Sequence, residues 1–203
     1  MPRRLREDVR TALAKLPGGR YRTILADPPW AWMRGGSSVK GTVSAKTGKT
    51  CVGAQGATPY QGMSTKELLA LGAQVRRVAA ADAHLYLWTV NKTFPDAVCL
   101  VREWGFRWVS VVTWDKQKPG LAKYFQGVTK HCVFAVRGAP PYKFIDGKMA
   151  QGRTLVSERM TDHSRKPESL RKVIERVSYG PRLELFARRC PGDWDAVGLE
   201  LEV

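Results

Sequence analysis

The sequence predicts an α/β fold in which helices cover both faces of a mostly parallel β-sheet. Short apolar segments alternate along the chain with segments whose apolar residues recur at helical spacing. The 203 residues are enough to bury a core of this kind, and the hydrophobic content of 43% is typical of globular proteins. No internal repeat or low-complexity tail interrupts the pattern. We therefore expect one domain over residues 1–203.

The first expected elements lie before residue 91. Residues 22–27, "RTILAD", form a short apolar run typical of a buried strand. Residues 64–79 have helical periodicity, and Ser64 followed three positions later by Glu67 predicts a capping box at the helix start. Residues 83–90, "AHLYLWTV", predict a second buried strand.

The middle of the chain continues the alternation. Residues 94–105 predict a helix that ends at Gly105, a residue favoured just beyond a helix C-terminus. Residues 107–114 and 131–138 predict strands, and residues 154–158 predict a short one.

The last expected elements are a helix over residues 166–178, with Pro167 near its start, and a strand over residues 182–188. In a parallel sheet, ligands bind at the carboxyl ends of the strands. Asp27 comes at such an end, so we expect it to lie in a binding crevice.

The net charge is +16, which favours a polyanionic partner, most simply nucleic acid. The alternative is a solvated basic surface. The charge is unevenly placed, since no acid occurs between positions 28 and 66 or between positions 116 and 145. Both stretches are rich in Gly, Pro, Ser and Thr, so we expect basic loops at about 31–58 and 116–130 that follow phosphates. The candidate contacts are Lys46, Lys49 and Lys116.

Other compositional features exclude several classes. The four cysteines are scattered, and with three histidines they show no metal-ligand spacing, so we expect reduced thiols and no metal. The charged first residues, "MPRRLREDVR", lack the apolar stretch of a secretory signal. No apolar run has the length of a membrane span. We expect a cytoplasmic protein without a membrane partner.

The tetrapeptide Asp27-Pro28-Pro29-Trp30 is the strongest candidate site. A carboxylate leaving a buried strand is costly unless something binds it. Two prolines fix the next two φ angles and remove two backbone donors. What remains is a set of acceptors beside a flat aromatic ring, which suits a planar group bearing an NH₂, such as a nucleobase. A rigid turn with a core tryptophan is the structural alternative.

This tetrapeptide resembles the signature of the MT-A70 family of N6-adenine methyltransferases. The resemblance continues in the family's order from about residue 22 to residue 201. The matching segments are "TPYQGMS", "LYLWTVN", "VVTWDK", "KHCVFAVRG" (the family has Glu-His-Cys-Leu-Val-Gly-Val-Lys-Gly), "HSRKPESL" (Ser-x-Lys-Pro-Asp/Glu) and "RLELFAR" (Glu-Leu-Phe-Gly/Ala-Arg).

The resemblance implies a Rossmann-like fold of S-adenosylmethionine-dependent methyltransferases. It also implies a permuted motif order, in which the catalytic motif precedes much of the cofactor site. This order is consistent with the absence of a G-x-G-x-x-G segment, because late segments would build the donor pocket.

The implied reaction transfers a methyl group from S-adenosylmethionine to the exocyclic amine of adenine and leaves S-adenosylhomocysteine. Asp27 and the Pro28 carbonyl would accept the two N–H groups and aim the nitrogen at the methyl. Trp30 would stack on the target base, and Tyr60 would line the pocket. A base within a duplex must be flipped out to reach such a site.

The cofactor site rests more heavily on the resemblance. It implies that Arg137, Ser164, Lys166 and Arg188 bind the donor together with Asp27. For each of the first four, a surface cation or a helix cap is the alternative. The family often has an Asn-Gln pair late in the chain for the ribose hydroxyls, whereas this sequence has Leu199 and Glu200. Only Glu200 offers a side-chain acceptor there.

Three functions follow from these observations. The first is a DNA adenine methyltransferase, acting as a monomer or a homodimer. The second is the same chemistry on RNA, which we rank lower because the basic loops and size resemble bacterial or phage DNA enzymes. The third, a non-catalytic nucleic-acid-binding partner, predicts a broken tetrapeptide and so ranks last.

Overall fold

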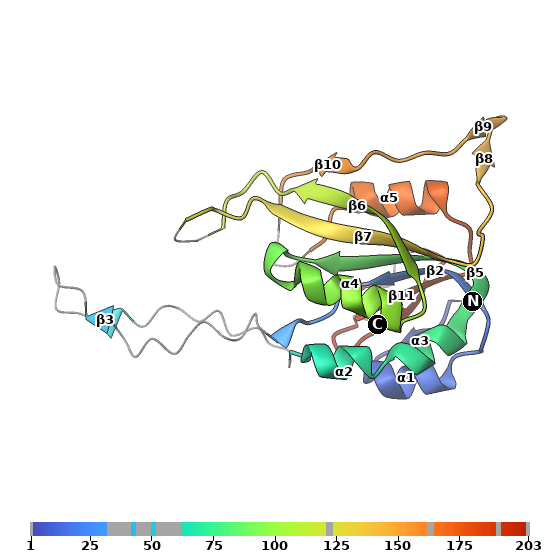
Figure 1. Ribbon diagram of the computed structural model, residues 1–203, viewed down its shortest axis with the longest axis horizontal. Helices are drawn as coiled ribbons and strands as arrows, with labels where there is room; N and C mark the ends of the chain where they lie inside the picture. The colour runs from blue at the N-terminus through green and yellow to red at the C-terminus, as the bar shows by residue number, and fades with distance from the viewer. Residues whose placement is uncertain are drawn as a thin grey trace.

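The computed structural model describes residues 2–31, 42–43, 50–51, 62–120, 124–161, 165–189 and 192–201. Its centre is an eight-stranded sheet with the strand order β1-β12-β11-β2-β5-β7-β6-β10 (Figure 1). The strands are β1 (Arg4–Leu5), β2 (Tyr21–Ala26), β5 (Ala79–Thr89), β6 (Arg107–Asp115), β7 (Thr129–Arg137), β10 (Leu155–Ser157), β11 (Arg182–Leu185) and β12 (Asp195–Val197).

The sheet is mixed and mostly parallel. Within the described sheet, β7 pairs antiparallel with both β5 and β6, and every other pairing is parallel. The expected α/β class with a mostly parallel sheet is confirmed. The direction of β7 was not predicted, because a strand's apolar pattern is the same in both directions. The segment between β6 and β7 therefore leaves the sheet and re-enters it at the same end, where β6 finishes and β7 begins.

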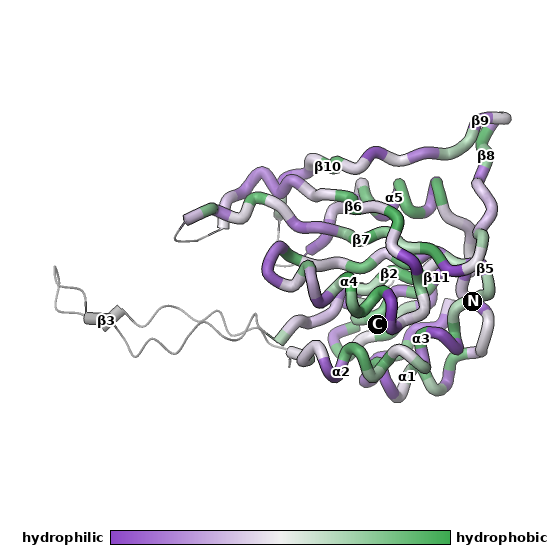
Figure 2. The backbone as a smooth tube through the Cα atoms, in the orientation of Figure 1, coloured by the Kyte–Doolittle hydropathy of each residue, from purple (hydrophilic) through white to green (hydrophobic). Residues whose placement is uncertain are grey.

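Helices cover both faces of the sheet, as expected. On one face, residues of α1, α2, α3 and α4 share a core with Ile24, Leu85 and Val133. On the other face, α5 buries Leu170 and Ile174 against aromatic side chains of β5 and β6. Hydrophobic and hydrophilic residues alternate along α5 (Figure 2), as expected for a helix with one buried face. The helices are α1 (Val9–Lys15), α2 (Thr65–Leu69), α3 (Gly72–Val78), α4 (Phe94–Glu103) and α5 (Glu168–Val177).

The helix predicted over residues 64–79 is two helices in the structure. Its capping box is confirmed, since Ser64 and Glu67 bond each other's backbone. The break follows α2, where the Trp104 indole N–H donates to the Leu68 carbonyl at 3.0 Å. A Cβ on Gly72 would lie 2.8 Å from the Glu103 carbonyl oxygen. The end of α4 therefore packs closely against the junction between α2 and α3.

Several short elements were not predicted. They include β1, α1 and β12, and also the pairs β3 (Thr42–Val43) with β4 (Thr50–Cys51) and β8 (Phe144–Ile145) with β9 (Lys148–Met149). A 3₁₀ turn, η2, spans Asn91–Thr93. Strands of two or three residues carry too little periodicity for recognition. Among the described residues, no helix is long and apolar enough to cross a membrane.

Candidate functional site

The Asp27–Trp30 corner follows β2 at the carboxyl edge of the sheet. The Trp30 amide donates to the Pro28 carbonyl at 3.0 Å, which closes a tight turn. The Met63 amide donates to the Pro29 carbonyl at 2.6 Å, and the Ala31 amide donates to the Met63 carbonyl at 2.9 Å. These bonds join the residues on either side of positions 32–61. The backbone after β2 is therefore held at two points.

Trp30 is part of the core as well as of the corner. It is 4% exposed, and its indole N–H donates to the Trp88 carbonyl at 3.2 Å. The ring packs with Leu68 and Leu87 in the same core cluster. Trp30 therefore fills the core and also lines the pocket, and its stacking on a base stays a prediction.

Asp27 forms an ion pair with Lys166, which lies 139 positions later in the chain. The Lys166 ammonium also lies 5.3 Å from the centre of the Trp88 ring, in a cation–π contact. Lys166 directly precedes Pro167, the N-cap residue of α5. The start of this helix thus places a cation against the corner's carboxylate. The pair bonds one carboxylate oxygen, so the other remains an acceptor.

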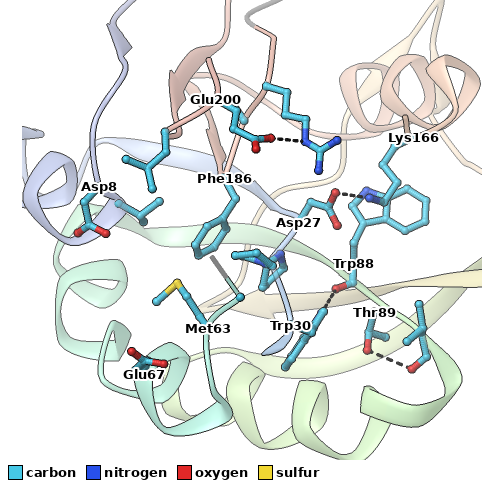
Figure 3. A pocket seen from close by; sticks show the side chains of 18 of the residues that line it. Asp8, Asp27, Trp30, Met63, Glu67, Trp88, Thr89, Lys166, Phe186 and Glu200 are labelled. Carbon is cyan, nitrogen blue, oxygen red and sulfur yellow. Dashed lines mark hydrogen bonds and ion pairs between the residues drawn. The ribbon is translucent and has the colours of Figure 1, made fainter. Parts of the chain in front are cut away.

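A pocket of about 410 Å³ opens beside this corner, a volume suited to a small-molecule cofactor. Figure 3 shows Asp27 between Trp88, Phe186 and Trp30 at its centre. The pocket lies outside the carboxyl ends of β2, β5, β11 and β12. The lining includes Asp8, Arg10, Asp27, Pro28, Pro29, Trp30, Met63, Glu67, Trp88, Thr89, Lys130, Lys166, Phe186, Arg188, Leu199 and Glu200.

The residues that follow β11 and β12 form one wall of the pocket, and this wall contains a second ion pair. Arg188 Nε lies 3.1 Å from Glu200 Oε2, and both side chains are partly exposed. Phe186 has a φ of +61°, which is rare for a bulky residue. A Cβ on Gly198 would lie 2.1 Å from the Ala187 carbonyl oxygen, so only glycine fits there. This close approach holds Phe186 and Arg188 beside Leu199 and Glu200.

Lys130, the second residue of β7, lines the opposite end of the pocket. It stands where the MT-A70 motif has Glu. Within the described part of the chain, no hydrogen bond or ion pair joins its ammonium to another side chain. Burial, with the nearby Lys166 ammonium, lowers the pKa of Lys130 from 10.5 to about 8. Lys130 is not among the site residues predicted from the sequence, although a cation in place of the motif's acid was a signal for it.

The structure brings some predicted site residues together and separates others. Asp27, Pro28, Pro29, Trp30, Lys166, Arg188 and Glu200 all line the pocket. Asp8 lines it too and also caps α1.

Arg137 and Lys116 do not line the pocket. Because β7 runs antiparallel to β5, Arg137 lies opposite Ala83 in the strand register, at the end of the strands away from the pocket. Its guanidinium donates to the Arg76 carbonyl at 2.6 Å. Lys116 is 9% exposed and donates to the Gly127 carbonyl at 2.7 Å, so it is a buried anchor rather than an open phosphate contact. Burial lowers the pKa of Lys116. Tyr60, Lys46, Lys49 and Ser164 lie outside the described residues.

No group of three or more candidate metal ligands occurs among the residues that the structure describes. The functional groups that line the pocket are carboxylates, ammonium and guanidinium groups and aromatic rings.

These features define a class of protein. An α/β domain has a cofactor-sized pocket at the carboxyl edge of its central strands, and a carboxylate there is backed by an ammonium group. The sequence matches the model of the MT-A70 family over residues 21–200. The chain belongs to this family of S-adenosylmethionine-dependent N6-adenine methyltransferases.

Individual relatives of the chain are named as methyltransferases or as subunits of methyltransferases. The chain is 27% identical over 192 residues to the Type II methyltransferase M.MunI of Mycoplasma sp. The matched region covers 92% of this chain and 80% of that protein. It is 25% identical over 196 residues to the human N(6)-adenosine-methyltransferase catalytic subunit METTL3, covering 91% of this chain but 29% of METTL3. It is 27% identical over 220 residues to the non-catalytic subunit METTL14 of Drosophila melanogaster, covering 98% of this chain and 51% of METTL14.

Proposed function

We propose that this chain transfers a methyl group from S-adenosylmethionine to the N6 amine of adenine in DNA. The observation that carries the proposal is the Asp27 carboxylate, held by Lys166 at the centre of the pocket (Figure 3). The chain also spans most of a relative named as a Type II methyltransferase, a name given to DNA-modifying enzymes.

The order of the strands suggests where each ligand binds. One end of the pocket is formed after β11 and β12 by Phe186, Arg188, Leu199 and Glu200. The other end is formed by Thr89 and Val90 after β5 and by Lys130 of β7. Asp27 follows β2, which lies between these two pairs of strands. A donor at the first end and a base at the second would therefore meet at Asp27.

The first end fits S-adenosylmethionine. Glu200 can accept hydrogen bonds from ribose hydroxyls, Phe186 and Leu199 offer apolar surfaces for the adenine, and Arg188 offers a cation for the carboxylate. The close approach of Gly198 to Ala187 holds these groups in one wall. Bound there, the cofactor supplies a methyl group on a positively charged sulfur.

The residues around Asp27 would orient the amine. The unpaired carboxylate oxygen accepts one N–H group and points the nitrogen at the methyl, while Lys166 fixes the carboxylate. The carboxylate also favours the positive charge that develops on nitrogen as the new bond forms. The Pro28 carbonyl already accepts from the Trp30 amide, so its second lone pair would accept the other N–H. The methylated amine then loses its extra proton to water or to Asp27.

An RNA adenine substrate is the second candidate, because several relatives are named as N(6)-adenosine-methyltransferases. The chain spans less than a third of these proteins, so their full activities give weak guidance here. A non-catalytic role ranks third. The similarity to METTL14 favours it, but the intact Asp27–Trp30 tetrapeptide argues against it.

An Asp27→Asn variant tests the proposal, because the amide has the same shape without the charge. We expect methyl transfer to fall about 10²- to 10³-fold, the usual effect of losing one transition-state contact. Donor binding, measured by calorimetry, should change little. Asp96→Asn, a change in the first turn of α4 outside the pocket, serves as the control. Near-full transfer by Asp27→Asn would contradict the assigned role.

A further inference from the structure

The loop between β6 and β7 is anchored at its base. The Lys116 amide donates to the Val128 carbonyl at 2.9 Å, and the Gly120 amide donates to the Gly127 carbonyl at 3.3 Å. The Lys116 ammonium adds a bond of 2.7 Å to the Gly127 carbonyl. The loop thus leaves the sheet along a path set by three hydrogen bonds.

Two adjacent aromatic residues of this loop are almost fully exposed. Tyr124 is 92% exposed and Phe125 is 90% exposed. Leaving a large apolar side chain in water forgoes about 1.5–3 kcal/mol of burial free energy. A neighbouring pair of such residues marks an interaction site more often than a single one does.

The loop lies beside the end of the pocket that we assign to the base. It leads into β7 at Thr129, and the next residue, Lys130, lines the pocket. Because β7 is antiparallel to both β5 and β6, the loop leaves the sheet at the end where β2 and β5 also finish. The exposed aromatic pair therefore belongs to a loop that leaves the sheet at the end where we propose that the target nucleotide enters.

The charge around the pair favours a nucleic acid over a protein surface of mixed charge. No acidic residue occurs from position 116 to position 145, and Lys118 and Lys130 flank the pair. Aromatic side chains between cations bind single-stranded or opened nucleic acid, since every base has a face on which a ring can stack.

We propose that Tyr124 and Phe125 stack on bases next to the target adenine and hold open the space that this base leaves when it flips out. The inference rests on the proposed function and adds a nucleic-acid contact to it. Apolar and aromatic wedges open base steps in this way, which offsets part of the cost of unstacking.

The test compares two matched double variants. Tyr124→Ala with Phe125→Ala removes the proposed wedge. Tyr142→Ala with Phe144→Ala removes two other exposed aromatic residues, which are 74% and 61% exposed and lie near the β8–β9 hairpin at the opposite end of the molecule. Labelled methyl transfer is measured on unmethylated plasmid duplex, on its heat-denatured strands and on transcribed RNA.

We expect the wedge variant to lose about 10- to 100-fold in kcat/KM on the duplex, as for the loss of one or two stacked bases. The loss should be smaller on denatured strands, whose bases are already unstacked. Donor affinity should be unchanged, and the control variant should match the wild type. Tyr124→Trp with Phe125→Trp should restore transfer, since tryptophan also stacks.

Equal activity of the wedge variant and the wild type on the duplex would overturn the inference and leave the proposed function intact. A wild-type chain that methylates neither DNA nor RNA would instead contradict the proposed function. A wedge variant that loses activity together with a change in molar mass by light scattering would overturn the inference too, because the pair would then bind another protein copy.

Discussion

Lys130 shows how much one residue can differ from its family pattern without disturbing the fold. Its ammonium is partly buried at the pocket, where the MT-A70 motif has an acid, and the Asp27 charge only partly offsets the cost of burial and of the nearby Lys166 ammonium. Burying a cation of this kind costs free energy unless an anion of a bound ligand pairs with it. In the proposed function, that anion is a phosphate next to the target base.

Replacing Lys130 by Met should stabilise the protein but weaken binding of the nucleic acid. The lysine's pKa is about 8 in the folded chain and near 10.5 in the unfolded chain, so its burial penalty is fully present below pH 8 and disappears above about pH 10.5. At pH 7 we expect a gain of roughly 1–2 kcal/mol after allowance for solvent screening, measured by urea unfolding.

The same residue gives the affinity a pH dependence. As the pH rises from about 7 to about 9, wild-type affinity for plasmid DNA should fall, because Lys130 loses its proton in that range. Lys130→Arg should flatten this profile, because arginine stays charged. Fluorescence anisotropy measures the affinity. A wild-type profile as flat as that of Lys130→Met would exclude the phosphate contact.

At the scale of elements, α5 is tied to β11 by a partly buried ion pair. Arg171 Nη2 lies 2.7 Å from Glu184 Oε2, and both side chains are 15% exposed. Burial raises the pKa of Glu184, and the charge and hydrogen bond of Arg171 act in the opposite direction. The same helix begins just after Lys166, so this pair also fixes the cation that holds Asp27.

Arg171→Met should destabilise the chain by about 3–5 kcal/mol, because it leaves a buried carboxylate without its cation. The double change Arg171→Met with Glu184→Met should recover most of that loss, since it removes both charges. Urea unfolding of the three proteins gives the comparison. If the single variant were as stable as the wild type, the pair would contribute nothing to the docking of α5.

The elements also show what the sequence could predict. Long apolar runs such as those in β5 and β6 were recognised because their periodicity spans many residues. At the break between α2 and α3, the Trp104 indole donates to the Leu68 carbonyl, a contact distant in sequence that local periodicity could not reveal. The antiparallel direction of β7 was hidden for the same reason, and it removed Arg137 from the pocket.

At the scale of the whole molecule, the excess of positive charge should control binding. With a net charge of +16, affinity for nucleic acid should fall steeply as salt rises, because phosphate contacts release counterions. Lys46 and Lys49 belong to the first acid-free stretch and stay predicted contacts. A motif marked the pocket positions of Asp27 and Lys166 in advance, whereas the cation in the motif's acid position, Lys130, could be placed in the pocket only once the strands were assembled.

Replacing Lys46 and Lys49 by Ala should weaken affinity for plasmid DNA and lower the slope of log affinity against log salt by about 1–2 units, or about one per lost phosphate contact. Donor affinity should not change. Binding isotherms at several salt concentrations measure the slope. An unchanged slope would place these two lysines away from the nucleic acid.

The most direct test of the central claim follows the methyl group itself. The wild-type chain is incubated with labelled S-adenosylmethionine and either plasmid DNA or transcribed RNA, and the products are digested to nucleosides. The account predicts label in N6-methyldeoxyadenosine, and about 10²- to 10³-fold slower formation of that product by Asp27→Asn. Label on a cytosine, or equal N6-methylation by the wild type and Asp27→Asn, would contradict it.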